Sequence, residues 1–363
     1  MKRAFDLDRC PSVVIWEATQ SCDLVCLHCL VNAQPKRHPL ELETAEAEKL
    51  IREVADFHPQ IFIITGGDPL KRFDIYHLVE YAIKQGLRVA IAPGTTPLLT
   101  KTAIAELKKV GLSRLALSLD GSDPERHDTF RGVPGSYART LQAIQWANEC
   151  HLPIQMNTMI SRRNLRDLEN IAHLMKDLRV GLWRLFFLVP GDREQMNDLP
   201  YASEFENVFA KLYQWSEEFS FKIKTAEAPH FRRYVIQQRQ KNTADGAENG
   251  TSGQLPTNDG KGSVFVSHTG EVCPGEFLPI SAGNFRQRSL ADIYRKSELF
   301  KALRNSANLR GRCGECEYKQ ICGGSRARAY AVAGDIFSQE PCCSVNPRLK
   351  SLQRDVALQP MHA

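Results

Sequence analysis

Between residue 11 and about residue 190, short apolar runs alternate with longer segments whose apolar residues recur every three or four positions. The short runs are rich in β-branched residues and apolar throughout, which is typical of strands buried on both faces of a sheet. The longer segments have the spacing of amphipathic helices. The pattern therefore predicts strands at 13–18, 61–65, 87–92, 114–121, 153–160 and 182–189, and helices at 44–57, 74–86, 101–111, 136–150 and 164–178.

Six strands that alternate with helices favour a parallel sheet, because parallel neighbours need a crossover and the crossover helices cover the sheet. The predicted fold class is α/β. If the strands lie in chain order, they form an open, six-unit partial (β/α) barrel of the TIM type, which we place at residues 1–200. Functional residues of such a barrel lie on the loops that follow the carboxyl ends of the strands.

The alternation is expected to stop after about residue 195. Residues 201–261 are predicted as a helical connection followed by a flexible loop, because residues 239–262 are polar and rich in Gly, Asn and Thr. A hairpin that turns at Thr269-Gly270 follows. We expect a small C-terminal module at 262–350 and a tail at 351–363.

The 363-residue chain has a net charge of +5 and eleven cysteines. This mild charge is spread along the chain, so no nucleic-acid partner is expected. No apolar run is long enough to span a membrane or to serve as a signal sequence, and we therefore expect a cytoplasmic protein. In a reducing compartment the cysteines are expected to be metal ligands or buried thiols rather than disulfides.

Three cysteines follow the first predicted strand at once. Cys22, Cys26 and Cys29 have the spacing Cys-x3-Cys-x2-Cys. Three thiolates can bind three irons of a cubane 4Fe–4S cluster and leave the fourth iron open to another ligand. Cysteines placed by chance, or part of a zinc knuckle, are the alternatives.

This triplet resembles the signature of the radical S-adenosylmethionine (radical SAM) superfamily. The resemblance implies a 4Fe–4S cluster whose open iron binds S-adenosyl-L-methionine (SAM). It also implies reductive cleavage of SAM to a 5′-deoxyadenosyl radical, which abstracts hydrogen from a substrate. A reducing electron donor such as flavodoxin or ferredoxin is the implied protein partner. The family fold is a six-unit partial barrel, in agreement with the strand count.

Other stretches resemble the SAM-binding segments of the same family. Gly66, Gly67 and Asp68 in "TGGDP" match its GGEP motif, with Asp where Glu is usual. By the same resemblance, Ser118 is expected near the ribose or carboxylate of SAM, Arg131 near the carboxylate, Asn157 and Leu188 near the ribose and adenine, and His28 near the adenine. The residues alone leave alternatives open: an ordinary turn at 66–68, a loop salt bridge for Arg131, core packing for Asn157 and Leu188, and a solvent-facing His28.

A second group of cysteines lies near the C-terminus. Cys313, Cys316 and Cys322 are followed by Cys343, with Cys342 as the alternative fourth ligand. Four thiolates close a site, which suits electron transfer or structure, and a structural zinc is the alternative. The spacing resembles the C-terminal SPASM extension. Ligands of its further cluster would fall near Arg288 and at Arg326, so a single auxiliary 4Fe–4S cluster, and two clusters in all, are predicted.

Further stretches of the sequence indicate the class of substrate by resemblance. The cysteine spacing, "GGSRARAYAVAGD" and "LFFLVPGDR" resemble the branch that acts on heme-type tetrapyrroles, which contains the alternative-heme-pathway decarboxylase and the denitrifier heme enzymes. Propionate side chains would need cationic partners, and the candidates are Arg193, Arg232, Arg233, Arg326 and Arg328. Radical modification of a ribosomally made peptide is the alternative, and a non-catalytic iron–sulfur or zinc protein is an alternative of another class.

Overall fold

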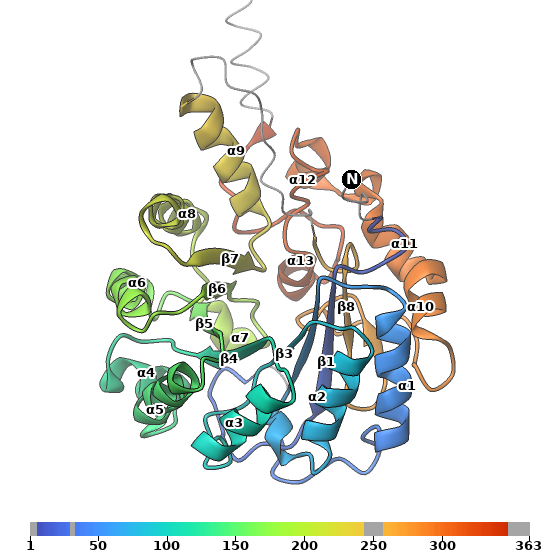
Figure 1. Cartoon of the computed structure of the whole chain (residues 1–363). Helices are drawn as coiled ribbons and strands as arrows, with labels where there is room; N and C mark the ends of the chain where they lie inside the picture. The colour runs from blue at the N-terminus through green and yellow to red at the C-terminus, as the bar shows by residue number, and fades with distance from the viewer. Residues whose placement is uncertain (1–5, 30–32, 243–256, 348–363) are drawn as a thin grey trace, which may run out of the picture.

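Seven parallel strands form the barrel of the protein. The structure, a computed structural model, describes residues 6–29, 33–242 and 257–347. The strands are β1 (Val13–Thr19), β2 (Ile61–Gly66), β3 (Val89–Ile91), β4 (Arg114–Ser118), β5 (Ile154–Ile160), β6 (Leu182–Phe187) and β7 (Lys222–Ala226). They lie side by side in chain order and curl into an open barrel (Figure 1). The predicted partial barrel is thus confirmed.

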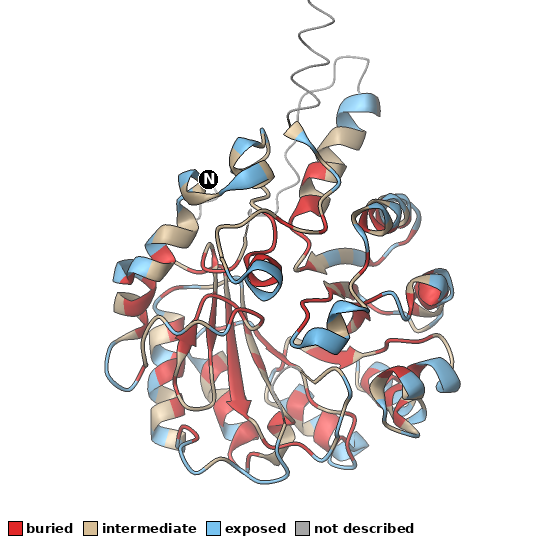
Figure 2. Ribbon diagram, turned by 180° about the vertical axis from the view of Figure 1, so that it is seen from behind, coloured by how far each residue is buried: buried red, intermediate tan, exposed pale blue. Residues whose placement is uncertain are grey.

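Helices cover the convex face of this sheet. The principal ones are α1 (Thr44–Ala55), α2 (Ile75–Lys84), α3 (Lys101–Lys109), α5 (Ser136–Glu149), α6 (Leu168–Asp177) and α8 (Ala202–Glu218). In α1 the buried residues Ala47, Leu50, Ile51 and Val54 form one stripe at helical spacing. This stripe packs into the main core with outward-facing strand residues such as Trp16. Figure 2 shows buried strands with helices that are buried toward the sheet and exposed outside. No helix in the described ranges is long and apolar enough to cross a membrane.

The alternation of helix and strand continues past residue 195, where we expected it to stop. After the short α7 (Arg193–Met196), helix α8 leads to β7, which pairs in parallel with β6. Strand β7 lies at the sheet edge and only Ala226 is buried, so it lacks the apolar run by which the other strands were predicted. Helix α9 (His230–Asn242) follows. Most of the flexible loop predicted at 239–262, and the tail predicted at 351–363, lie outside the described residues.

The C-terminal module extends the same sheet from its other edge. The predicted hairpin is present as β8 (Ser263–Val266) and β9 (Val272–Cys273), with Gly270 at a φ of +88° in the turn. Strand β8 pairs in parallel with β1, which gives nine strands in one sheet. The helices that follow are α10 (Leu290–Lys296), α11 (Glu298–Arg304), η3 (Ser306–Asn308), α12 (Gly311–Glu315) and α13 (Arg326–Ala333). Helix α13 lies between the β7 and β8 sides of the open barrel (Figure 1).

One buried arginine joins the C-terminal module to the barrel. Arg328 of α13 forms two hydrogen bonds, of 3.1 and 3.0 Å, with the carboxylate of Glu340, and both side chains are fully buried. The same guanidinium donates to backbone carbonyls of Leu188 (2.9 Å), Phe187 (3.2 Å) and Glu227 (2.6 Å). A single side chain therefore binds the ends of β6 and β7 and the C-terminal loop.

We predict that Arg328→Gln lowers the free energy of unfolding by about 3–5 kcal/mol, because the change leaves Glu340 as an unpaired buried charge. The measurement is denaturant unfolding of the reconstituted protein under anaerobic conditions. The matched control is Arg310→Gln, since Arg310 is exposed and pairs with Asp335 on the surface at 3.0 Å. We expect a loss below about 1 kcal/mol for the control. Equal losses in both variants would contradict a special role of the buried pair.

Candidate functional site

The three N-terminal cysteines lie together on the loop that follows β1. The Cys22 N–H donates to the Gln34 carbonyl (2.8 Å), which brings the far side of the loop back to the strand. Burial raises the pKa of the Cys22 thiol, and the negative charges of Asp68, Cys26 and Cys29 raise it further. These groups are therefore within electrostatic reach of one another. The Leu24 N–H donates to the Cys22 sulfur at 3.4 Å, a contact that stabilises a thiolate.

Gly66 and Gly67 are required by the close approach of two chain segments. A Cβ on Gly66, whose φ is +156°, would lie 2.3 Å from the Thr19 carbonyl oxygen. A Cβ on Gly67 would lie 2.5 Å from the Ser21 oxygen and 2.6 Å from that of Gln20. The end of β2 can therefore reach the start of the cysteine loop only without side chains. This backbone packing distinguishes the segment from an ordinary turn.

Asp68 directs its side chain into the protein. The fully buried carboxylate accepts hydrogen bonds from the Thr96 hydroxyl (2.7 Å) and the Leu70 N–H (3.1 Å), where it caps the short helix η1 (Pro69–Lys71). Its backbone N–H donates to the Ser21 carbonyl at 2.7 Å. The contacts of Asp68 therefore hold the β2 end against the cysteine loop, and burial raises the pKa of its carboxyl group.

Arg131 connects the cysteine loop to the barrel. It is the last residue of α4 (Pro124–Arg131), a short helix that the sequence pattern did not predict. One terminal nitrogen donates to Asp120 (2.8 Å) and the other to the Cys26 sulfur (3.5 Å). Its Nε is buried and has no hydrogen-bond partner within the described ranges. Arg131 thus forms a salt bridge, which was the alternative that the sequence left open. The salt bridge lies beside the Cys26 thiol, and the Nε of Arg131 remains as a donor for a bound anion.

His28 lies in a largely apolar wall and is not solvent-facing. Its side chain is 17% exposed, and its ring meets the Phe130 ring edge-on with centroids 4.9 Å apart. Burial lowers the pKa of His28 to about 4, so the imidazole is neutral at pH 7. Among the described residues, none forms a hydrogen bond with its buried Nδ1. Phe130 also packs with Met159 and Leu188, so His28 and Leu188 share one wall.

Ser118 and Asn157 are neighbours across the β4–β5 pair. Their Cα atoms are in register, and in a sheet residues in register project to the same face. Both are half-buried. The Asn157 side chain accepts a hydrogen bond from Gln155 at 2.7 Å. Asn157 is therefore not in the apolar core, whereas Leu188 is buried in the cluster around Phe130.

The C-terminal cysteines surround a small cavity. Its lining includes the four thiols Cys313, Cys316, Cys322 and Cys343. Cys342 does not line it, because its sulfur turns away and donates to the Pro200 carbonyl at 3.5 Å. The geometry therefore groups Cys343, and not Cys342, with the other three thiols.

Backbone N–H groups face these thiols. The sulfurs of Cys316 and Cys322 each accept an N–H bond at 3.4 Å from the residue two positions on, and Cys313 accepts one from Glu340 at 3.3 Å. Burial raises the pKa of Cys322 to about 12 and that of Cys343 to about 11. Protonated thiols are therefore favoured without metal, and binding of a cluster would release protons. In the described ranges no three ligand side chains converge as they would on a single ion. Four thiols arranged around a cavity suit a cubane 4Fe–4S cluster, in which each thiolate binds a different iron.

Four of the five arginines considered for propionates are bound to the protein instead. Arg232 donates to the Ile321 carbonyl (2.9 Å), and Arg326 to the carbonyls of Ile336 (2.8 Å) and Ser338 (2.7 Å). Arg233 pairs with Glu206, and Arg328 with Glu340. Arg193 is exposed on α7. The sequence alone does not distinguish an arginine that is hydrogen-bonded within the protein from one that is available to a ligand.

Two family profiles match the chain. The profile described as "Radical SAM superfamily" matches residues 16–175, and "Iron-sulfur cluster-binding domain" (SPASM) matches residues 258–317. A protein of Methanosarcina barkeri named AdoMet-dependent heme synthase is 38% identical over 346 residues, which cover 94% of this chain and 98% of the relative. The chain belongs to the radical SAM superfamily. It is therefore an enzyme that binds a 4Fe–4S cluster and SAM, as predicted. Its SPASM region binds additional iron–sulfur cluster material, also as predicted.

More distant relatives are consistent with this assignment. A PqqA peptide cyclase of Rhodopseudomonas palustris is 27% identical and covers 93% of this chain and 88% of its own. The crystal structure of Streptococcus suis SuiB bound to S-adenosylmethionine superposes with a TM-score of 0.71 at 15% identity, over 93% of this chain and 78% of that one. At such low identity this superposition supports the fold alone.

Several residues of this radical SAM enzyme's interior were missed from the sequence. Asp120 directly follows β4, and its buried carboxylate binds both Arg131 and the Met159 N–H. Arg184 is a charge within the apolar run of β6, a signal that was visible in the sequence. Glu227 has a φ of +57°, unusual for a residue with a side chain, and lines an internal cavity. Such strained residues are frequent at functional sites.

We predict that Cys343→Ser lowers the iron content of the anaerobically reconstituted enzyme from about eight to about four atoms per chain, because one cubane loses a ligand. Cys342→Ser is the matched control and should keep about eight. The measurement is iron and sulfide analysis with the visible absorbance of the clusters. The reverse result, with iron lost only in Cys342→Ser, would contradict the grouping of the thiols.

Proposed function

We propose that this radical SAM enzyme acts on a carboxylate side chain of a heme-type tetrapyrrole, by decarboxylation or oxidation. The observation that carries the proposal is the 38% identity to an AdoMet-dependent heme synthase over almost the whole length of both chains. The similarity spans both cysteine groups and the strands between them. The PqqA peptide cyclase matches over a comparable length but at 27% identity. Modification of a peptide is therefore the second candidate.

We also propose which residues hold the cofactors. Cys22, Cys26 and Cys29 would bind the first cluster and leave one iron for SAM. Gly66, Gly67, Asp68, Ser118, Arg131, Asn157, Leu188 and His28 would form the SAM site. The partnerless Nε of Arg131 and Nδ1 of His28 support a polar ligand there. When bound, the cluster and SAM supply the 5′-deoxyadenosyl radical.

The chain's own residues set the conditions for that chemistry. Phe130, Leu188 and Met159 form a buried apolar wall. His28, whose imidazole is neutral, is half-buried against Phe130 and lies 3.7 Å from the Asp120 carboxylate. Such a wall limits the access of water to a reactive intermediate. Arg131 supplies a fixed positive charge beside Cys26, with its orientation set by Asp120. A planar guanidinium in this position suits a carboxylate ligand.

A single auxiliary cluster is proposed at Cys313, Cys316, Cys322 and Cys343. Four thiols close the site, so it would exchange electrons rather than bind substrate. Of the two other cysteines of the module, Cys342 donates to the Pro200 carbonyl, and Cys273 packs with Ile15 and Phe265 in an apolar cluster. Arg326 is hydrogen-bonded to carbonyls, and neither it nor Arg288 can ligate iron. A flavodoxin or ferredoxin is proposed as the electron donor.

We predict that the reconstituted enzyme forms 5′-deoxyadenosine from SAM under a strong reductant, and forms more of it with an iron porphyrin that carries propionates. Product masses should show loss of carbon dioxide or of hydrogen from the porphyrin. The Cys22→Ala, Cys26→Ala, Cys29→Ala triple variant should form none while keeping its auxiliary iron. Stimulation by short peptides and not by the porphyrin would favour the second candidate.

A further inference from the structure

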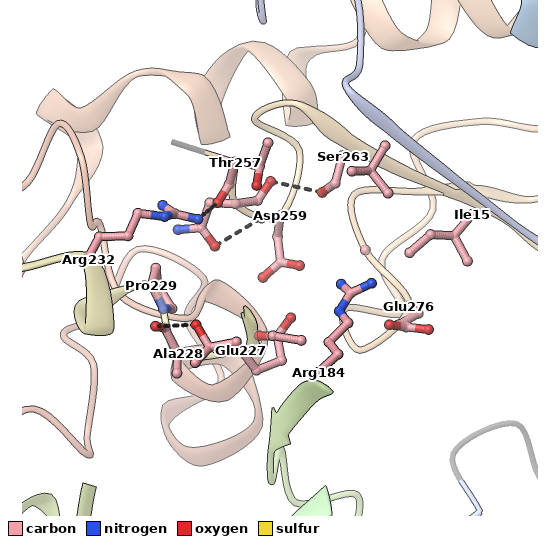
Figure 3. Close-up of a pocket in the computed structure, with 15 residues that line it drawn as sticks. Ile15, Arg184, Glu227, Ala228, Pro229, Arg232, Thr257, Asp259, Ser263 and Glu276 are labelled. Atoms are coloured by element: carbon pink, nitrogen blue, oxygen red, sulfur yellow. Dashed lines mark hydrogen bonds between the residues drawn. The ribbon is translucent and has the colours of Figure 1, made fainter. Parts of the chain in front are cut away.

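Cationic side chains line the concave face of the barrel in register with the proposed SAM residues. Ser118 of β4 pairs with Asn157 of β5, Asn157 with Arg184 of β6, and Arg184 with Lys224 of β7. Since registered residues of a sheet project to one face, the four form a single row. Arg184 lines an internal cavity with Ile15, so the row faces the barrel interior (Figure 3).

Arg114, at the start of β4, belongs to the same group. It donates to Gln155 (2.9 Å), and Gln155 donates to Asn157 (2.7 Å). Hydrogen bonds therefore run from this cation to a proposed SAM residue. Burial lowers the pKa of Lys224, and the nearby charges that lower it further include Arg184 and Arg114. The three cations are therefore close enough to repel one another.

These cations differ from three other arginines described above. Arg131, Arg233 and Arg328 each pair with a carboxylate. In the part of the chain that the structure describes, neither Arg114, Arg184 nor Lys224 forms an ion pair. Arg114 and Arg184 are partly buried, whereas Lys224 is exposed at the sheet edge. Uncompensated positive charge on the two arginines is unfavourable, and an anionic ligand would remove the cost.

Three acidic side chains face Arg184 across the cavity. Asp259, Glu227 and Glu276 lie around its guanidinium group in Figure 3. Burial raises the pKa of each carboxyl group, that of Glu227 to about 8. Glu227 is therefore largely protonated at pH 7, and in that form its carboxyl group can donate a hydrogen bond. The cavity thus offers the Arg184 cation and a donor on the opposite wall.

We propose that Arg184, together with Arg114 and Lys224, binds a carboxylate side chain of the substrate. The inference rests on the proposed function, in which the substrate is a tetrapyrrole with several propionates. Arg184 is one strand away from Asn157, about 5 Å across the sheet. A carboxylate held at Arg184 fixes one side of the substrate. A neighbouring side chain of the same molecule then faces SAM.

The test is equilibrium binding of an iron porphyrin that carries propionates, and of its methyl ester, to the reconstituted enzyme. Absorbance in the porphyrin band is the readout. The variants are Arg184→Gln and Lys224→Gln. Their matched controls are Arg166→Gln and Lys176→Gln, which are exposed residues of the helical layer. Arg184→Gln should weaken binding of the acid about tenfold or more and lose its salt dependence. Binding of the ester should change little.

The two binding probes separate failure of this inference from failure of the proposed function. If Arg184→Gln does not fold, it also fails to bind the ester and loses its cluster absorbance. Lys224→Gln then provides the test. Equal affinity of wild-type enzyme and both variants for the acid overturns the carboxylate site while the tetrapyrrole assignment stands. Wild-type enzyme that binds neither the acid nor the ester overturns the proposed function and this inference together.

Discussion

The buried Arg328–Glu340 pair is the interaction on which the arrangement of both halves depends. A curled sheet that does not close leaves two edges and an open side. Here α13 occupies that side, and Arg328 satisfies carbonyls at the ends of β6 and β7. Glu340 in turn accepts the N–H groups of Ser325 (2.7 Å) and Cys342 (3.1 Å), which fixes the loop around the auxiliary thiols. The barrel and the second cysteine group are therefore positioned by the same charges.

Much of the fold could be predicted because its signals are local. Strands β1 to β6 are apolar runs, and the helices between them carry buried stripes, so both follow from periodicity alone. Strand β7 could not be found in this way, because Lys222 and Lys224 interrupt its apolar pattern at the sheet edge. The pairing of β8 with β1 joins residues some 250 positions apart. No local pattern encodes such a contact.

The residues of the candidate site also divide into those with a local sequence signal and those that depend on distant contacts. The spacing of Cys22, Cys26 and Cys29 is local and was sufficient to predict an open cluster. The local sequence was not sufficient to distinguish Cys342 from Cys343 as a ligand. The difference depends on a distant group, because the Pro200 carbonyl accepts a hydrogen bond from the Cys342 thiol. From the sequence Arg328 was a candidate partner for the propionates of the substrate, whereas the structure shows it fully buried and paired with Glu340. Whether an arginine is free or paired is decided by tertiary contacts, so the sequence lists candidates but cannot rank them.

The interior of the barrel combines two environments that oppose each other. Around His28, Phe130 and Leu188 the wall is largely apolar, and the buried Asp120–Arg131 pair beside it adds no net charge, which suits the generation of a radical away from water. Along Arg184 and Lys224 it is charged, which suits recognition of an anion. A charged substrate side chain placed against the neutral wall would lose its hydration without compensation. Binding of other carboxylates by the row is what can compensate that loss, so that the reacting group is held at the neutral wall by contacts made elsewhere on the same molecule.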